Sequence, residues 1–333
     1  MPVRVTAGGR LLFGFLNLAL DRERLYGGLG VALDAPAVTV EAAPADGVEV
    51  ADPALEVHAR RSVDRLDVDG ARVELEAALP SHAGLGSVTQ TALAVHAAIA
   101  RAHDREPAVR AAAPALDRGG RSGVGVAAFE RGGFVVDAGH PTAEYTHERP
   151  APGAWTVPPV AVRHALPTGW RFVLVTPDVP PGRSGEAEEA SMRAVVEGAD
   201  ASIADRLSAV VVDRLLPAVA SGDVRAFGGA VGEVGRLNGQ WYAAEQGGIY
   251  RPPVGPIVDA LDGCEAAFGA GQSSWGPTVY AVSDATHVEA AEAAARDALA
   301  DAGLEGTVRV ARPRNVGATV EERPPAAKGD DQP

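Results

Sequence analysis

A glycine-rich turn that leads into a helix carries the clearest chemistry in the sequence. The turn spans Pro80–Ser87 and contains Gly84-Leu85-Gly86-Ser87, and apolar residues then recur at helical spacing from Val88 to Ile99. Glycines let a backbone approach an anion closely, while the free N–H groups and the dipole of a first helical turn attract phosphate. The segment therefore predicts a phosphate-binding loop. A plain glycine turn with Ser87 as the helix N-cap is the alternative.

Composition excludes several classes of function. The net charge of -14 repels nucleic-acid phosphates, and the sequence shows no local basic patch, so we expect no nucleic-acid partner. Lys328, near the C-terminus, is the only lysine. A Walker A loop, a Schiff-base enzyme and a protein-kinase strand lysine each need a lysine within the fold, so all three are excluded.

The sequence also bounds the compartment. No apolar run is long enough to span a bilayer, and the stretch Met1–Phe15 leads into polar residues without a small-residue cleavage site. Cys264 is the only cysteine and cannot form an intramolecular disulfide. We therefore expect a cytoplasmic protein without a membrane partner.

Short strand patterns dominate the first half of the chain, and mixed helices and strands fill the second. The apolar run Val124–Phe129, two glycines and Phe134–Asp137 predict a hairpin, and Leu55–Val57 predicts a strand. We expect domains at residues 1–160 and 161–320 and a disordered charged tail at 321–333. The predicted fold class is α+β, with two layers rather than a doubly wound sheet. In the second half the expected elements are strands at 172–175, 278–282 and 308–310 and helices near 186–198, 202–220, 223–236 and 286–301.

Three glycine-rich segments occur in the order typical of one superfamily. Gly84–Ser87, Gly119–Gly123 and Gly269–Ser274 resemble the first, central and C-terminal loops of the GHMP kinases. The resemblance implies a two-domain fold, with an N-terminal domain like ribosomal protein S5 domain 2 and a ferredoxin-like C-terminal α/β sandwich.

Within that superfamily the chain resembles the beta-ribofuranosylaminobenzene 5'-phosphate synthases, from about residue 10 to about residue 315. The sequence departs from the family's pattern at Phe15–Leu18, where an acidic residue is common. The resemblance is carried by Gly27–Leu33, Gly84–Gln90, Arg121–Phe129, Gly133–His140, Gln246–Gly248 and Gly271–Thr278.

Two kinase groups are missing from the matched motifs. GHMP kinases generally place a second hydroxyl after the loop serine, and many place an aspartate two residues after the central Ser-Gly pair. Here those positions are Val88 and Gly125, although Thr89 follows closely. Valine cannot hold a metal ion and glycine cannot accept a proton, so phosphoryl transfer is disfavoured. An ATP-dependent small-molecule kinase remains the main alternative, and a non-catalytic binding protein is a third.

The resemblance implies a condensation of phosphoribosyl pyrophosphate with 4-aminobenzoate or 4-hydroxybenzoate, which releases carbon dioxide and pyrophosphate. It also implies Mg²⁺ on the phosphates and a possible homodimer, but it does not define metal ligands. Phosphate binding falls to Gly84, Leu85, Gly86, Ser87, Thr89, Gln90, Ser122 and Gly123, and substrate binding to Gln272, Ser273 and Ser274.

Three further residues are candidates for catalysis. Arg121 lies inside a motif, and its guanidinium can bind a phosphate or a carboxylate with two hydrogen bonds. Asp137 and His140 follow a predicted strand and could ligate Mg²⁺ or move a proton. A turn held by the aspartate beside a solvated histidine is an equal alternative. Trp275 could stack on the aromatic substrate, although core packing is the commoner role of a tryptophan.

Overall fold

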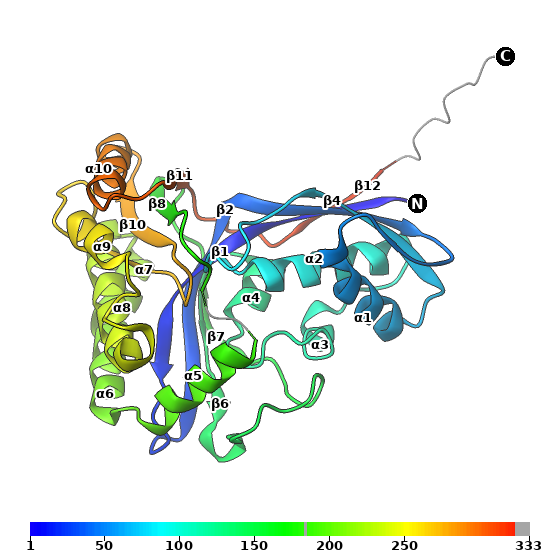
Figure 1. The fold of residues 1–333 in the computed structure, drawn as a ribbon, viewed down its shortest axis with the longest axis horizontal. Helices are drawn as coiled ribbons and strands as arrows, with labels where there is room; N and C mark the ends of the chain where they lie inside the picture. The colour runs from blue at the N-terminus through cyan, green and yellow to red at the C-terminus, as the bar shows by residue number, and fades with distance from the viewer. Residues whose placement is uncertain (183–184, 324–333) are drawn as a thin grey trace.

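The computed structural model describes residues 1–182 and 185–323, which form two lobes joined along one pair of strands (Figure 1). The first lobe is built on an eight-stranded sheet in which β12, β1, β2, β4 and β3 lie side by side. The strands β5 and β6 also pair with β2, and β7 pairs with β5. Only the β3–β4 pair is parallel. The strands are β1 (Val3–Asn17), β2 (Arg24–Pro44), β3 (Gly47–Val50), β4 (Gly70–Ala77), β5 (Phe134–Asp137), β6 (His140–Pro141), β7 (Val160–His164) and β12 (Thr319–Glu322).

The strands β1 and β2 are long enough to serve both lobes. They pair from Val3–Ala42 to Asn17–Tyr26 and change register twice, between Gly8 and Arg10 and between Leu12 and Gly14. Such irregularities bend a strand and increase its twist. The pair therefore leaves the first sheet and runs down between the lobes, as Figure 1 shows.

One face of the first sheet is covered by helices. The helix α2 is buried along most of its length, and its apolar residues form a core with Val5, Val40 and Val73 of the sheet. A second helix, α4, lies beside it (Figure 1). The helical elements of this lobe are α1 (Glu56–Leu66), α2 (Ser87–Ala102), α3 (Val109–Ala112), α4 (Val124–Arg131) and the 3₁₀ turns Pro53–Leu55 and Thr142–Glu144.

The second lobe is a four-stranded antiparallel sheet packed on helices. Its order is β11-β8-β10-β9, with β8 (Trp170–Pro177), β9 (Ala270–Gln272), β10 (Val279–Asp284) and β11 (Gly306–Ala311). The long helix α8 packs against β1, β9 and β10 and thereby ties the lobes together. The helices are α5 (Glu186–Glu197), α6 (Ala201–Val210), a π-helical turn (Val211–Leu215), α7 (Leu216–Ser221), α8 (Val224–Gln246), α9 (Gly255–Asp262) and α10 (Val288–Asp301).

The expected α+β class is confirmed, but two local predictions were wrong. Residues Val124–Phe129 belong to the helix α4 and not to a hairpin strand, because their apolar side chains are buried between α2 and the sheet. Leu55–Val57 lies in a 3₁₀ turn and the start of α1, because the Asp52 side chain accepts a hydrogen bond from the Ala54 N–H and starts a helical turn there.

The domain limits also differ from those expected. The strand β7 pairs with β5, so the first sheet continues past residue 160. The strand β12 returns to the first sheet, where Glu321 and Glu322 pair with Arg4 and Val3, so the expected tail begins inside a strand. Residues 324–333 of that tail lie outside the described residues. Among the described residues, none of the helices combines the length and apolar character that crossing a bilayer requires.

Candidate active site

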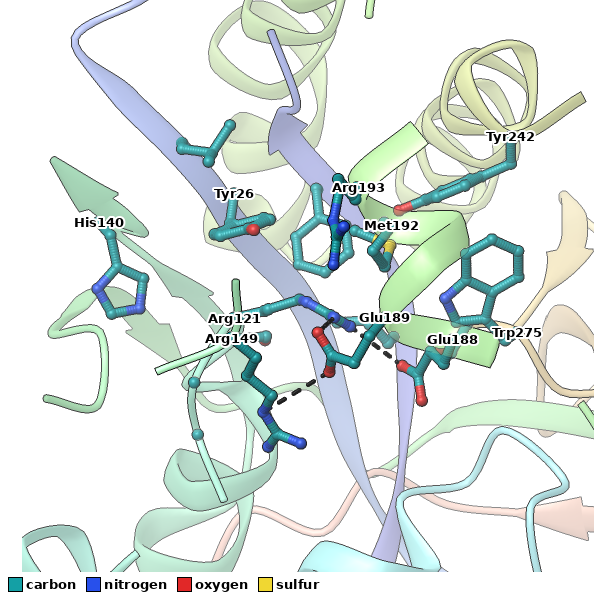
Figure 2. Close-up of a pocket in the computed structure, with 18 of the residues that line it drawn as sticks. Tyr26, Arg121, His140, Arg149, Glu188, Glu189, Met192, Arg193, Tyr242 and Trp275 are labelled. Atoms are coloured by element: carbon teal, nitrogen blue, oxygen red, sulfur yellow. Dashed lines mark hydrogen bonds and ion pairs between the residues drawn. The ribbon is translucent and has the colours of Figure 1, made fainter. Parts of the chain in front are cut away.

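A cavity of about 830 Å³ opens between the two lobes. Its walls come from β1, β2, the start of α2, the loop before α4, residues 140–155, α5, α8 and the loop after β9. A volume of this size suits a small organic substrate. Figure 2 shows the arginines, carboxylates and aromatic rings that face each other across it.

The predicted phosphate loop adjoins one end of this cavity. His82, Val88 and Thr89, on either side of the loop, line the cavity, whereas Gly84–Ser87 do not. Gly84 and Gly86 have φ values of +90° and +80°, which favour glycine, and α2 begins at Ser87. The carbonyl oxygen of Gly84 accepts hydrogen bonds from an Arg10 guanidinium nitrogen at 2.6 Å and from the Ser273 hydroxyl at 2.8 Å. The loop is thus held with the free N–H groups of the first turn of α2 at the cavity's edge.

Arg10 is a cavity-lining candidate that sequence reasoning missed. It lines the cavity and lies against Gly86, where an added Cβ would come within 3.1 Å of the arginine side chain. Burial lowers the pKa of Arg10 to about 10, while the charge of Glu188 raises it. No carboxylate of the described residues forms an ion pair with Arg10. Its charge is therefore available to an anion. The sequence feature that could have pointed to Arg10 was a lone arginine before Leu11 in a buried strand.

The other predicted phosphate-binding residues divide into two groups. Thr89 and Ser122 line the cavity, together with His82 and Val88. Gln90 is fully buried and donates to the Gly125 carbonyl oxygen at 2.8 Å, so it joins α2 to α4 behind the loop. Leu85 is buried, and its carbonyl oxygen accepts the Arg10 N–H.

Asp137 organises the central loop from behind. Its carboxylate accepts hydrogen bonds from the Ser122 hydroxyl at 3.0 Å, the Gly123 N–H at 2.7 Å and the Gly139 N–H at 2.9 Å. Burial raises the pKa of Asp137, and these hydrogen bonds lower it. The residue is fully buried and is not among those that line the cavity. These contacts favour the turn-holding alternative, and direct catalysis by Asp137 stays a prediction.

His140, in contrast, lines the cavity at the end away from the phosphate loop. Its ring meets that of Tyr26 edge to face, with centroids 6.4 Å apart, and Tyr26 packs on Phe15 at 5.7 Å. Tyr145 and His147 form a further edge-to-face pair at 5.6 Å. We call these five residues, Phe15, Tyr26, His140, Tyr145 and His147, the aromatic end. Arg10, His82, Val88 and Thr89 with the loop that they adjoin form the phosphate end.

Arg121 lies between the two ends, but its charge is already engaged. Its guanidinium forms ion pairs with Glu188 at 3.4 Å and with Glu189, both at the start of α5 (Figure 2). Glu189 also lies 3.6 Å from Arg149. Burial raises the pKa of Glu188, whereas Arg121 lowers it. Arg121 therefore reaches the predicted site without being a free cation.

Arg193 contributes a second cation from α5. It follows Glu189 by one helical turn and faces the middle of the cavity in Figure 2. Among the described residues, no carboxylate lies within ion-pair distance of Arg193. Arg10 and Arg193 therefore place cations without ion-pair partners among the described residues at two points of the cavity.

The third glycine loop braces the phosphate loop. The Ser273 hydroxyl accepts the Leu12 N–H at 3.1 Å and donates to Gly84, and Ser273 itself is fully buried. Gln272 and Ser274 line the cavity, where the Gln272 amide donates to the Ser274 carbonyl oxygen. Trp275 also lines it and meets Tyr242 edge to face at 4.8 Å. Substrate contact by Gln272 and Ser274 stays a prediction, and Ser273 positions the loop.

The structure also explains the two missing kinase groups. Val88 lines the cavity, so no hydroxyl is present there. At Gly125 an added Cβ would come within 3.1 Å of the Thr89 methyl group, because α2 and α4 pack closely. An aspartate at this position requires the two helices to move apart.

Comparisons with known proteins show the family to which the chain belongs. The family model described as GHMP kinases C terminal matches residues 215–301. The beta-ribofuranosylphenol 5'-phosphate synthase of Methanothermobacter thermautotrophicus is 32% identical over 297 residues, 84% of this chain and 88% of the relative. The synthase of the same name from Archaeoglobus fulgidus is 30% identical over 96% of this chain and 99% of its own length. The chain belongs to this synthase family.

Solved structures show the fold that the family shares. Mevalonate kinase of Leishmania major matches with a TM-score of 0.66 and 15% identity over 93% of this chain and 96% of its own. Phosphomevalonate kinase of Streptococcus pneumoniae matches with a TM-score of 0.65 and 14% identity over 94% of this chain and 99% of its own. The expected GHMP-kinase fold is therefore confirmed, and the expected synthase family with it.

Proposed function

We propose that this synthase joins carbon 1 of phosphoribosyl pyrophosphate to the carboxyl-bearing ring carbon of 4-hydroxybenzoate, with release of carbon dioxide and pyrophosphate. The observation that carries the proposal is the 32% identity, over 84% of the chain, to a relative named beta-ribofuranosylphenol 5'-phosphate synthase. That name contains a phenol, so the hydroxy acid is preferred to the amino acid left open by the sequence. The cavity supports the proposal because it combines a phosphate loop with a wall of aromatic rings.

The donor fits the phosphate end. Its pyrophosphate would accept hydrogen bonds from the first-turn N–H groups of α2 and from Arg10, whose charge is unpaired among the described residues. Arg193 would bind the 5'-phosphate from α5. The two anionic groups of the donor would thus occupy the two points where Arg10 and Arg193 place their charge, which leaves the ribose between them.

The chemistry needs positioning more than proton removal. The bond between ribose carbon 1 and pyrophosphate breaks with its electron pair on the leaving group, while a ring electron pair forms the carbon–carbon bond. The carboxylate then leaves as carbon dioxide, and its electron pair restores the aromatic ring. The residues of this chain hold the leaving group, exclude water and align the ring carbon with the ribose. No base at position 125 is required, in agreement with Gly125.

Mg²⁺ would enter with the pyrophosphate rather than occupy a resident site. The described residues contain no group of three or more His, Cys, Asp or Glu side chains that could hold a metal ion. Mg²⁺ needs only one or two carboxylates when phosphates and water supply its other ligands. Glu188, whose charge acts on Arg10, and the Thr89 hydroxyl would supply the protein's oxygens. The bound ion would supply charge neutralisation on the leaving group.

Product analysis tests the proposal. The protein should release labelled carbon dioxide from carboxyl-labelled 4-hydroxybenzoate when phosphoribosyl pyrophosphate and Mg²⁺ are both present. ATP with small-alcohol acceptors should give no acceptor-dependent ADP. Assays at low and at molar salt guard against mistaking an unfolded acidic protein for an inactive one. Acceptor-dependent ADP without carbon dioxide would overturn the proposal in favour of a kinase.

A further inference from the structure

Buried polar atoms without partners gather in one short segment of the cavity wall. Nε2 of His140, the hydroxyl of Thr142 and the hydroxyl of Tyr145 are all buried, and none has a hydrogen-bond partner among the described residues. Unsatisfied buried polar atoms are few in folded proteins, because each forfeits its hydrogen bonds to water. His140 and Tyr145 also line the cavity, so a ligand bound there lies beside these unsatisfied atoms.

The backbone under His140 is held firmly. His140 pairs with Leu25 where β6 joins β2. The Arg24 guanidinium donates to the carbonyl oxygens of Ala138 and Gly139, and Asp137 accepts the Gly139 N–H. A side chain carried on such a support is positioned in advance for its ligand. The buried carboxylate of Asp137 therefore acts on the cavity through the position of His140.

The surroundings of these atoms suit a flat ring. Tyr26 lies between Phe15 and His140, with its side chain on the cavity wall beside His140 (Figure 2). Its φ of +69° is a conformation that bulky residues seldom adopt. Backbone strain of this kind gathers at ligand-binding sites, where the fold over-determines it. The arrangement keeps a large aromatic surface facing the cavity beside two unsatisfied polar atoms.

The second pair of aromatic residues stands in the wrong place for the acceptor. Trp275 and Tyr242 adjoin the phosphate end, because Gly276 packs on the backbone of Ala83 and Gly84. Phosphoribosyl pyrophosphate has the α configuration and the relatives' product is a β riboside, so the ring must attack the face opposite the pyrophosphate. The aromatic end lies on the side of the cavity away from the phosphate loop and meets this condition.

We propose that His140 and Tyr145 bind the ring hydroxyl of the acceptor, and that Nε2 of His140 takes its proton as the new bond forms. This inference rests on the proposed function. A phenol hydroxyl donates one hydrogen bond, to Nε2, and accepts one, from the Tyr145 hydroxyl, so both orphan atoms are satisfied. An ether oxygen in place of the ring hydroxyl donates no hydrogen bond and leaves Nε2 of His140 unpaired.

The proton transfer balances without another reactant. As the proton moves to Nε2, the oxygen's electron pair enters the ring and the ring carbon bonds to ribose carbon 1, while pyrophosphate leaves with its electron pair. Loss of carbon dioxide then returns a pair to the ring and leaves a phenolate oxygen. His140 returns the proton to that oxygen, and the imidazole ends in its starting form.

Ligand comparison by calorimetry tests the inference. Affinities for 4-hydroxybenzoate and 4-methoxybenzoate are measured in the presence of inorganic pyrophosphate and Mg²⁺, and their ratio reports the hydroxyl contact. We expect the ratio in the wild type to fall by roughly 5- to 20-fold in His140→Phe and in Tyr145→Phe, the range for one hydrogen bond in a buried site. Tyr250→Phe is the matched control, because the Tyr250 hydroxyl is also buried and unpartnered in a cavity-lining residue. Its ratio should match the wild type.

A conservative variant separates binding from proton transfer. His140→Gln retains a hydrogen-bonding side chain but cannot take the proton, so it should keep most of the affinity ratio and lose at least tenfold in carbon dioxide release. An unchanged ratio in folded His140→Phe and Tyr145→Phe, with wild-type turnover intact, overturns this inference alone. A wild type that releases no carbon dioxide and does not prefer the hydroxy acid overturns the proposed function as well.

Discussion

The two ends of the cavity are built in different ways. The phosphate end consists of backbone brought together from distant segments, where Arg10, Ser273 and Gly276 all close on the residues 83–84. The aromatic end consists of side chains on three neighbouring segments: β1 at Phe15, the paired β2 strand around Tyr26, and the stretch that follows Asp137. Backbone packing tolerates few substitutions, whereas the aromatic side chains can change one at a time. We therefore expect the first end to resist substitution and the second end to be easier to change.

The largest effect should come from crowding the phosphate end. In Gly276→Ala the added Cβ would lie 2.1–2.2 Å from the backbone of Ala83 and Gly84, so one loop must move. We expect the free energy of unfolding to fall by about 3 kcal/mol, the upper range for overpacking. Urea denaturation measures this. Gly255→Ala is the control, because no atom lies within 4 Å of its added Cβ, and its stability should be unchanged. Equal stability of both variants would show that the loops yield easily.

Arg10→Gln should weaken ligand binding at the phosphate end and leave ligand binding at the aromatic end nearly unchanged. The variant removes the unpaired cation of the phosphate end, so the affinity for inorganic pyrophosphate should fall by roughly 10- to 100-fold, or about 1.5–3 kcal/mol for a charged hydrogen bond. The affinity for 4-hydroxybenzoate should stay within about twofold in the absence of pyrophosphate. Calorimetry measures both. An equal loss for both ligands would mean that one continuous site, rather than two ends, binds the substrates.

Gly125→Asp tests whether this single substitution allows phosphoryl transfer at the phosphate end. The new Cβ meets the Thr89 methyl group at 3.1 Å, so we expect about 1 kcal/mol of destabilisation. Acceptor-dependent ADP should remain at background, because position 88 still carries valine where the kinases generally place the hydroxyl that follows the loop serine. Denaturation and ADP assays measure the two effects. Phosphoryl transfer that appears with this single change would show that the loop kept its kinase geometry.

The sequence predicted the phosphate end better than the aromatic end for a physical reason. Glycines with positive φ and a following helix are local features, so Gly84, Gly86 and α2 can be read from a short window. The bond from Arg10 to Gly84 spans 74 positions and that from Ser273 spans 189, and no local pattern encodes either. The prediction of a hairpin strand at Val124–Phe129 failed for a related reason. A helix that is buried on several sides loses the periodicity that distinguishes it from a strand.

Arg121 shows the same limit at a single residue. Its motif predicted a free guanidinium for a phosphate or carboxylate, but α5, more than 60 residues away, brings Glu188 and Glu189 against it. The expected loss of anion affinity in Arg121→Ala is correspondingly complicated, because the variant exposes two carboxylates as well as removing a cation. The charge balance around Arg121 is therefore better tested by a substitution of one of the two carboxylates than by a substitution of Arg121.

Glu189→Gln should have the smallest effect, and its sign is the informative part. The variant frees Arg121 and Arg149 from their ion pairs with Glu189. Pyrophosphate or phosphoribosyl pyrophosphate should therefore bind about two- to fivefold more tightly, within 1 kcal/mol because both pairs are partly exposed. Glu144→Gln is the matched control. It removes the same charge from the cavity wall but releases no arginine, since Glu144 forms no ion pair among the described residues. Calorimetry at two salt concentrations compares them. A rise of equal size in both variants would mean that only the net charge of the cavity matters. A rise confined to Glu189→Gln would place an arginine paired with Glu189, Arg121 or Arg149, within reach of the donor and extend the phosphate end towards the middle of the cavity.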